Sequence, residues 1–470
     1  MNDWNLAHER FVSNWNGTSL FEVSSVISVA PASVLLYRSF LTVWGPSKGY
    51  TFIVEFILIM LPLLSAMTFA SDFSLHLIII LIILSAFLLK QSSCNTDKHP
   101  SSWQLIEFPD KLPFISGYRA YINISTAVAI LAVDFNIFPR RFAKTETYGV
   151  SVMDVGVGAY IVANGIVSVE ARRHHNLHVV NHVVGTCYGS IVLIALGIAR
   201  LIVVKVSNYH EHVSEYGRHW NFFFTLAVVK FVSAIFVPLI PRSVPFSAAL
   251  MGGLIMGLYQ YGLSVCGLKD YLLFGFHGNG SRSNVVDANR EGLLSCVGYL
   301  AIYLFSVELG RVVFRRRWEG VIKTVKEWIY FCLSLLTFDI LCWFLLSLAT
   351  QHVDAVSRRM ANLTYVLWQV AYNTFALICF LSLDILFLII EFNHKTSTSL
   401  LSCGVLIEAI GQHQLVYFLS ANLLTGLINK MIFTLAASSL VAFIILSVYL
   451  ILLSLLVLVI KQKGITTKVW

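Results

Sequence analysis

Long apolar stretches separated by short polar loops form the main pattern along the 470-residue chain. A helix that crosses a bilayer needs about 20 mostly apolar residues, and unbroken runs such as ILSVYLILLSLLVLVI favour helices over the alternating strands of a barrel. The pattern therefore predicts about thirteen membrane spans. They lie near residues 22–44, 51–70, 73–90, 118–138, 149–169, 186–206, 220–240, 245–265, 293–313, 328–349, 363–390, 412–429 and 432–460.

The composition agrees with this pattern. Hydrophobic residues make up 57% of the chain and charged residues only 12%, whereas soluble domains carry about 25% charged residues. No loop is long enough for a soluble domain, and no internal repeat is visible. We therefore expect an all-α, polytopic integral membrane protein in which residues 1–470 form a single multi-span domain, with short tails at about 1–21 and about 461–470.

The basic residues of the loops indicate how the spans are oriented. An odd number of spans places the two termini on opposite sides, and Lys and Arg are enriched in short cytosolic loops. The densest basic cluster, FRRRWEGVIKTVK at residues 314–326, therefore predicts a lumenal N-terminus and a cytosolic C-terminus. On this topology Asn16, in the sequon NGT, faces the lumen and is a candidate glycosylation site.

Composition also bears on nucleic-acid and metal binding. The net charge of +8 is explained by the orienting loops, and no RNA-binding motif or zinc-knuckle spacing indicates a nucleic-acid partner. The eight cysteines include no CxxC pair. The run HHNLHVVNH at residues 174–182 has spacings that can hold zinc, although a surface turn is the favoured interpretation. We expect no metal site and no bound cofactor.

A run of charged residues lies at the membrane boundary between the fourth and fifth predicted spans. Residues 133–158 read VDFNIFPRRFAKTETYGVSVMDVGVG. Ionisable side chains are costly at such a position, so this cluster is a candidate functional site. Its charged members are Asp134, Arg140, Arg141, Lys144, Glu146 and Asp154.

Two kinds of chemistry suit this run. Asp134 ends an apolar span, and the break at Pro139 could return the chain so that Lys144 meets it. Burial and a nearby cation would adjust the pKa of Asp134, which makes this carboxylate a candidate general base. The alternative is that the ion pair only stabilises the turn. Arg140 and Arg141 could bind a phosphate as planar forks, or they could serve orientation alone.

Three further polar loops lie on the same predicted side, because every second loop faces that side. Lys and Arg are normally enriched in cytosolic loops, so basic residues on the lumenal side need another explanation. Binding of an anionic lipid headgroup would account for them. His219 is an alternative general base or, equally, a helix-capping residue. The candidates in these loops are Glu215, His219 and Asn221 in EHVSEYGRHWN, Asn289 and Arg290 in DANREG, and Arg358, Arg359 and Asn362 in SRRMAN.

The same motifs carry a family resemblance. AILAVDFNIFPRRFAKTETYG, MDVGVG, YHEHVSEYGRHWNFFFTL, ANREG, AVSRRMANLTYVLW and LSANLLTGLIN occur in this order through most of the chain. They resemble the PIG-W family, which includes the fungal GPI-anchored wall transfer proteins.

The resemblance implies a multi-pass enzyme of the endoplasmic reticulum membrane in GPI-anchor biosynthesis. Its members transfer a fatty acyl group, typically palmitoyl, from acyl-CoA to the inositol 2-hydroxyl of glucosaminyl-phosphatidylinositol (GlcN-PI). It also implies that Asp134 and Lys144 form the reactive pair. The implied partners are GlcN-PI, acyl-CoA as co-substrate, and membrane lipids. Span count alone would also allow a lipid transporter or flippase, which is the alternative prediction.

Overall fold

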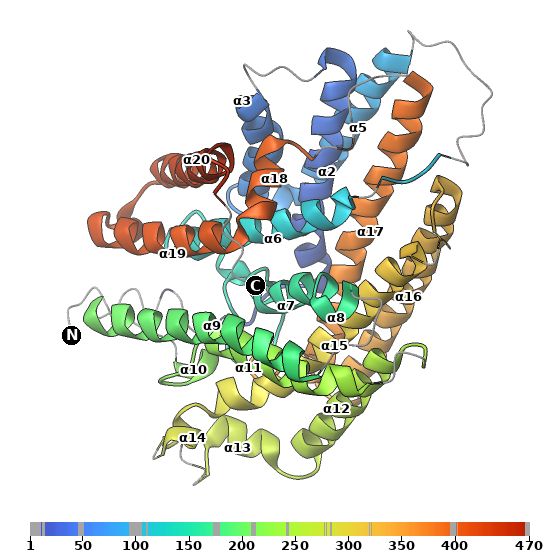
Figure 1. The fold of residues 1–470 in the computed structure, drawn as a ribbon. Coiled ribbons are helices and arrows are strands. Elements are labelled where there is room, and N and C mark those ends of the chain that lie inside the picture. The colour runs from blue at the N-terminus through green and yellow to red at the C-terminus, as the bar shows by residue number, and fades with distance from the viewer. Residues whose placement is uncertain are drawn as a thin grey trace.

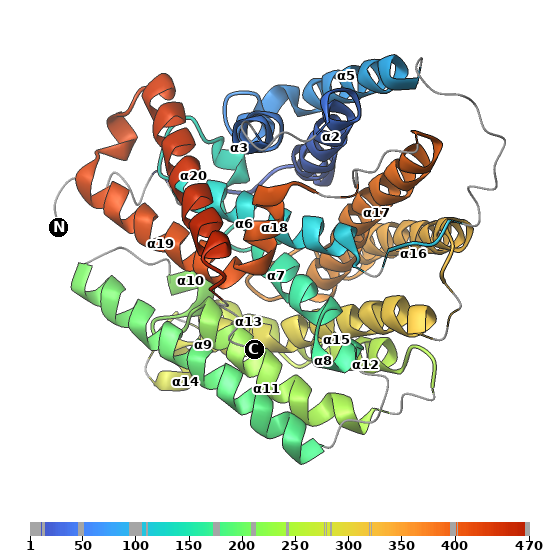
Figure 2. The same ribbon diagram turned by 45° about the horizontal axis from the view of Figure 1, so that its top comes forward.

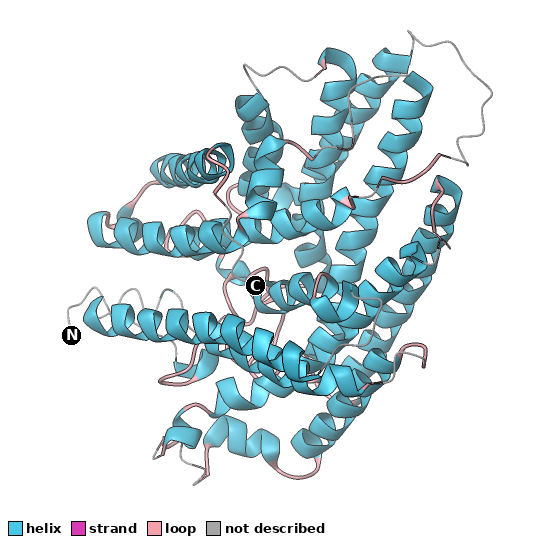
Figure 3. Ribbon diagram, viewed as in Figure 1, coloured by secondary structure: helices cyan, strands magenta, loops and turns pink. Residues whose placement is uncertain are grey.

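A computed structural model describes most of the chain (Figure 1). The described residues are 11, 15–45, 51–93, 106–109, 111–172, 179–207, 213–240, 244–276, 278, 280–282, 284–318, 320, 322–394, 401 and 403–465. Within these ranges the structure consists of helices and connecting loops, with a few isolated backbone bridges and no extended strand (Figure 3). The all-α prediction is confirmed.

The helices occur in the following order. They are α2 (Leu20–Trp44), α3 (Thr51–Glu55), α4 (Leu61–Ala66), α5 (Ser74–Ser93), α6 (Pro113–Ala132), α7 (Val155–Ile166), α8 (Val169–Arg172), α9 (Val179–Ser207), α10 (Val213–Tyr216), α11 (Phe222–Phe236), α12 (Ser247–Ser264), α13 (Leu268–Phe274), α14 (Val285–Ala288), α15 (Arg290–Trp318), α16 (Val325–His352), α17 (Leu363–His394), α18 (Val405–Gln412), α19 (Gln414–Met431) and α20 (Ser439–Gln462).

Side chains at the helix starts explain several of these boundaries. Ser19 caps α2 by accepting a hydrogen bond from the backbone N–H of Glu22, at 3.1 Å. Asn221 caps α11 by accepting from the N–H groups of Phe223 and Phe224. Such side-chain oxygens satisfy donors that the first helical turn leaves unpaired. These caps fix the segments before α2 and α11 relative to the bundle.

Not every predicted span is long and apolar enough to cross a bilayer. Eight described helices meet both requirements, or nine if the pair α12 and α13, bent by 69° at the intervening residues, forms one span. The remaining predicted spans, at 51–70, 118–138, 149–169 and 412–429, contain shorter or more polar helices. The count of about thirteen is therefore not confirmed. Helix α7 has only 12 residues, because the polar loop before it extends to Asp154.

The buried helices lie at the centre of the bundle. The most apolar window of α15 is 72% buried and that of α2 is 67% buried, whereas α5 is only 17% and α9 only 22% buried. Helix α15 contacts α7, α11, α12 and α17, and α9 packs against α11, as Figures 1 and 2 both show. The outer helices expose apolar side chains, as expected of surfaces that face lipid.

Candidate active site

The four polar loops contact one another. We define the loop cluster as residues 133–154, 213–221, 284–291 and 353–362. The backbone N–H of Gly149 donates to Val356 O at 2.9 Å, and that of His219 donates to Asn289 Oδ1 at 2.8 Å. Arg359 and Glu291 form an ion pair at 2.8 Å. The loops that were predicted to share one side of the membrane thus lie together in the structure, and the side on which they lie stays a prediction.

Glycines allow the loops to approach so closely. Gly149 has φ +123°, and a Cβ on it would lie 2.2 Å from Asn16 O. Gly217 has φ +104°, and its Cβ would lie 2.5 Å from Ala288 O. Both positions combine a left-handed backbone with contact too tight for any side chain. The N-terminal segment joins the cluster too, since the N–H of Thr18 donates to Val150 O at 2.7 Å.

Arg358 and Lys144 are held together by carboxylates at the centre of the loop cluster. Arg358, whose side chain is 5% exposed, donates to Asp154 Oδ1 at 2.7 Å and lies 3.5 Å from Glu215. Lys144 binds both oxygens of Glu215, at 2.7 and 2.9 Å. Asp154 also accepts from Thr145 and Ser151. Chain segments distant in sequence therefore supply one charged network.

The surrounding cations determine the ionisation of Glu215. Burial by itself would raise the pKa of this carboxyl, but Lys144 and Arg358 outweigh burial and lower the pKa to about 2. Glu215 is consequently ionised at neutral pH. Because a strongly acidic carboxyl is a weak proton acceptor, Glu215 suits the positioning of cations better than general base catalysis.

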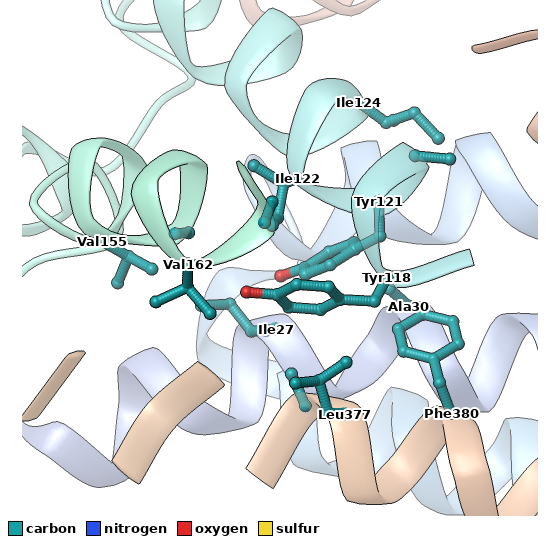
Figure 4. Close-up of a cluster of buried hydrophobic side chains, with 14 of the residues drawn as sticks. Ile27, Ala30, Tyr118, Tyr121, Ile122, Ile124, Val155, Val162, Leu377 and Phe380 are labelled. Atoms are coloured by element: carbon teal, nitrogen blue, oxygen red, sulfur yellow. The ribbon is translucent and has the colours of Figure 1, made fainter. Parts of the chain in front are cut away.

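A cavity of about 150 Å³ begins at this network and extends between helices α2, α6 and α7. Its polar end includes Lys144, Arg200, Glu215, Tyr216 and Arg358, and so carries three cations against one carboxylate. Apolar side chains, among them Val26, Ile27, Leu63, Met67, Ile122 and Val155, line the remainder. Figure 4 shows Ile27, Tyr121, Ile122 and Val155 converging from these helices. A cationic end beside an apolar interior suits an anionic lipid.

Lys144 and Asp134 occupy different places. Lys144 lines the cavity, whereas Asp134 does not. The carboxylate of Asp134 is 1% exposed and accepts a hydrogen bond from Asn429 Nδ2 at 2.7 Å. It lies one turn beyond Ile130, a cavity residue at the end of α6. The expected meeting of the two side chains as an ion pair does not occur, because Lys144 pairs with Glu215 instead.

Arg140 and Arg141 bind protein groups and not the cavity. The guanidinium of Arg140 donates to the carbonyl oxygens of Val133, Phe135 and Phe138, at 2.8–2.9 Å for its terminal nitrogens. It thereby satisfies carbonyl groups at the end of α6. Arg141 pairs with Glu22, at 2.8 Å, and with Asp72. In the structure these two arginines fix the turn that presents Lys144.

Asparagine side chains set the starts of two helices and join two loops. Asn221 caps α11 and also donates to Gly197 O at 3.0 Å. Asn362 accepts from the N–H groups of Ser357 and Tyr365, both at 3.1 Å, and so caps α17. Asn289 receives the N–H of His219. These residues position the loop cluster and do not line the cavity.

The other predicted candidates are distributed around the cluster. Arg290 is 2% exposed and binds Leu272 O and Asp287. His219 is exposed, and Glu146 is partly buried; neither lines the cavity. Asn16 is exposed, and its glycosylation stays a prediction.

The histidine run and the tails extend beyond what the structure describes. His174, His175 and His178 lie outside the described residues, as do residues 1–10 and 466–470 of the two tails. The one described histidine of the run, His182, pairs with Glu170 at 3.0 Å.

Arg200 is the charged cavity residue that the sequence analysis did not single out. It lies within α9, in the apolar stretch GIARLIVV, and acts electrostatically on Glu215. An arginine inside a long apolar segment was a usable signal, because such charges are expensive in a membrane and mark functional positions. The spacing of loop motifs gave no indication that α9 would reach the site.

Known proteins resemble this chain over nearly its whole length. A family model described as GWT1 matches residues 4–460. A human protein named glucosaminyl-phosphatidylinositol-acyltransferase PIGW is 34% identical over 507 residues, which cover 98% of this chain and 99% of that protein. The Dictyostelium discoideum phosphatidylinositol-glycan biosynthesis class W protein is 34% identical over 98% of each chain. The Candida glabrata GPI-anchored wall transfer protein 1 is 33% identical over 94% of each.

Proposed function

The chain belongs to the GWT1 family, and we propose that it is the acyltransferase that moves a fatty acyl group, typically palmitoyl, from acyl-CoA to the inositol 2-hydroxyl of GlcN-PI. The cavity carries this proposal, since its cationic end meets an apolar interior. One end suits the phosphate of a phosphoinositide, and the other suits hydrocarbon. The proposed location is the endoplasmic reticulum membrane, with a lumenal N-terminus and a cytosolic C-terminus.

The proposed reaction is direct transfer without an acyl-enzyme intermediate. The inositol 2-hydroxyl oxygen attacks the thioester carbonyl carbon, the new C–O bond forms, and the C–S bond breaks. Asp134 accepts the hydroxyl proton, and the departing CoA thiolate takes up a proton from solvent. Lys144 stabilises the negative charge that develops on the carbonyl oxygen. Asp134 reaches the hydroxyl once the substrate occupies the space beside Ile130, because general-base contacts often tighten only in the substrate complex.

Arg358 and Arg200 have a separate role in the proposal. Their guanidinium groups lie at the cavity end where the inositol phosphate would enter, and planar guanidinium forks suit phosphate oxygens. Glu215 holds Lys144 and Arg358 at this end before substrate binds. The remaining candidates of the loop cluster, such as Arg140 and Asn362, act as positioning residues in this account.

Transfer from labelled acyl-CoA tests the proposal against the transporter alternative. The protein is reconstituted into vesicles that contain GlcN-PI and lack other enzymes. We expect label to appear in GlcN-PI only when the protein is present. Redistribution of GlcN-PI between the leaflets without incorporation of label would instead support a flippase. Acylation of GlcN-PI that requires a phospholipid as the acyl donor and does not depend on acyl-CoA would contradict the proposed donor.

A glycine in the cavity predicts a change in acyl-chain preference. Gly156 lines the cavity, and a Cβ on it would meet no atom within 4 Å. We expect Gly156→Leu to lower the rate with palmitoyl-CoA about tenfold or more, and the rate with a short-chain donor less, because the new side chain occupies cavity space. Initial rates with donors of graded chain length measure this preference.

A smaller substitution provides the control for Gly156. Gly156→Ala should retain normal rates and chain preference, since one methyl group fits the open space and alanine favours the helix. By contrast, a Cβ on Gly158 would lie 2.3 Å from Gln369, so this glycine serves packing of α7 on α17. An equal decrease in rate with all donors in Gly156→Leu would show that the cavity is not the acyl-chain site.

A further inference from the structure

Two buried hydrogen-bond donors lie side by side at the end of the α6–α19 pair that is far from the loop cluster. Arg119 of α6 donates through Nη2 to Oε1 of Gln414, the first residue of α19, at 3.0 Å. Arg119 Nε and Gln414 Nε2 are both buried, and neither has an acceptor in the described part of the chain. Buried donors are normally satisfied, so two adjacent exceptions point to an acceptor that a ligand supplies.

A second guanidinium adds positive charge to the same place. Arg172, at the end of α8, acts electrostatically on Arg119, and the two positive charges repel each other. Arg172 is exposed and its guanidinium lies 5.4 Å from the ring centre of Phe314. None of the described carboxylates pairs with either arginine. The carboxylate of Glu170, two residues before Arg172, binds His182 and Tyr303 instead.

Two hydrogen bonds connect this position to the cavity. Asn123 donates to the backbone oxygen of Arg119 at 2.9 Å and accepts from the hydroxyl of Tyr160 at 2.7 Å. Tyr160 lines the cavity, together with Phe418 and Asn422 of α19. Helices α6 and α19 are joined at their other end by the hydrogen bond between Asp134 and Asn429. The cavity therefore lies between two polar ends of one helix pair.

The two polar ends are far apart. Arg119 lies about 20 Å along α6 from the end of that helix at Ala132, at a rise of about 1.5 Å per residue, and Asp134 follows two residues beyond this end. A single inositol phosphate whose 2-hydroxyl meets Asp134, as proposed, could not also reach Arg119 at this separation. A transfer reaction needs two substrates, and acyl-CoA carries several phosphate groups joined to the thioester by a long, flexible arm. On the predicted topology the start of α6 faces the cytosol, where acyl-CoA is dissolved.

We propose that Arg119, Arg172 and Gln414 form a second phosphate-binding site, which holds the phosphate groups of the acyl donor while its thioester reaches the cavity. The inference rests on the proposed acyl transfer. Both CoA and the lipid substrate carry phosphate esters. The KM values for acyl-CoA and for GlcN-PI therefore show which of the two molecules supplies the phosphate bound at this site. Arg119 and Arg172 supply charge-assisted hydrogen bonds, and Gln414 supplies a neutral one.

The test measures KM for acyl-CoA and for GlcN-PI in reconstituted protein carrying Arg119→Leu or Arg172→Ala. We expect KM for acyl-CoA to rise about tenfold or more while KM for GlcN-PI stays the same. Arg119→Lys should restore part of the loss, because it keeps the charge. Lys326→Ala, which removes an exposed cation of α16, is the matched control and should change neither constant. Arg172 is exposed, so its variant is expected to fold normally.

A second readout does not depend on turnover. CoA without an acyl group should raise the thermal unfolding temperature of the wild-type protein in detergent and not that of Arg119→Leu. A rise in KM for GlcN-PI alone would overturn the assignment to the donor, and unchanged constants in an active enzyme would overturn the site. Wild-type protein that neither binds CoA nor transfers acyl groups would instead refute the proposed function itself.

Discussion

Lys144→Ala is expected to lower kcat for inositol acylation by a factor of about 10²–10³, the usual loss when one stabilising donor is removed from a developing oxyanion. Lys144 is the cation of the loop cluster that lines the cavity without binding a backbone group. Removal of Lys144 leaves Glu215 close to Arg358, at 3.5 Å, so no carboxylate is left without a cation and the fold should persist. Initial rates at saturating concentrations of both substrates measure kcat directly.

Asp134→Asn completes this experiment. Asparagine has the size of aspartate and can still accept the hydrogen bond from Asn429, but it cannot take a proton from the inositol hydroxyl. We expect kcat to fall by about 10²–10⁴, the range for loss of a general base. Lys269→Ala is the matched control for Lys144→Ala, because Lys269 is about as exposed as Lys144 and also pairs with a carboxylate, that of Asp354, outside the cavity. Near-normal kcat in both Lys144→Ala and Asp134→Asn would contradict the proposed catalytic pair.

Arg358→Ala is expected to destabilise the protein and to abolish activity. Its guanidinium is nearly completely buried and binds Asp154, whose side chain is fully buried. Loss of one partner from a buried ion pair costs about 3–5 kcal/mol, because the other charge stays in a poorly solvating environment. Thermal unfolding in detergent, followed by size-exclusion chromatography, should show a clear decrease in Tm alongside the loss of turnover.

The neighbouring arginine provides the control for Arg358. Arg359 pairs with Glu291, but Glu291 also binds Arg282 at 2.6 Å and so keeps a cation when Arg359 is removed. Arg359→Ala should therefore lower Tm less than Arg358→Ala and retain substantial activity. Equal stability of the two variants would show that Arg358 does not hold the loop cluster together. Full activity of Arg358→Ala would exclude its proposed contact with the substrate phosphate.

The sequence was sufficient to predict the helical class and the association of the four loops. Apolar runs about 20 residues long form helices in a bilayer. The four loops were grouped from the alternation of about thirteen spans, and they contact one another in the structure although that count is not confirmed. Lys144, Glu215 and Arg358 were predicted because charge is rare elsewhere in the chain, and all three line the cavity. The family resemblance named the chemistry, which charge pattern alone could not distinguish from lipid transport.

Packing decided what the sequence left open. A guanidinium group can donate to phosphate oxygens or to backbone carbonyl oxygens. In the turn after α6, Arg140 donates to three backbone carbonyl oxygens. Glu215 and Asp134 are both acidic residues near polar loops, and only tertiary contacts place one of them against Lys144. Helices α6 and α19 were predicted as spans from their length, although their polar residues, including Arg119, serve contacts inside the bundle.

The most direct test of the central claim is the structure of the product formed by purified protein in vesicles that contain only GlcN-PI and acyl-CoA. Tandem mass spectrometry of the lipid identifies which hydroxyl carries the new acyl group. The account predicts GlcN-PI with one additional acyl chain on the inositol 2-hydroxyl, formed by wild-type protein and about 10²–10³ times more slowly by Lys144→Ala. Acylation of the glucosamine, or no acylated lipid from correctly folded wild-type protein, would contradict it.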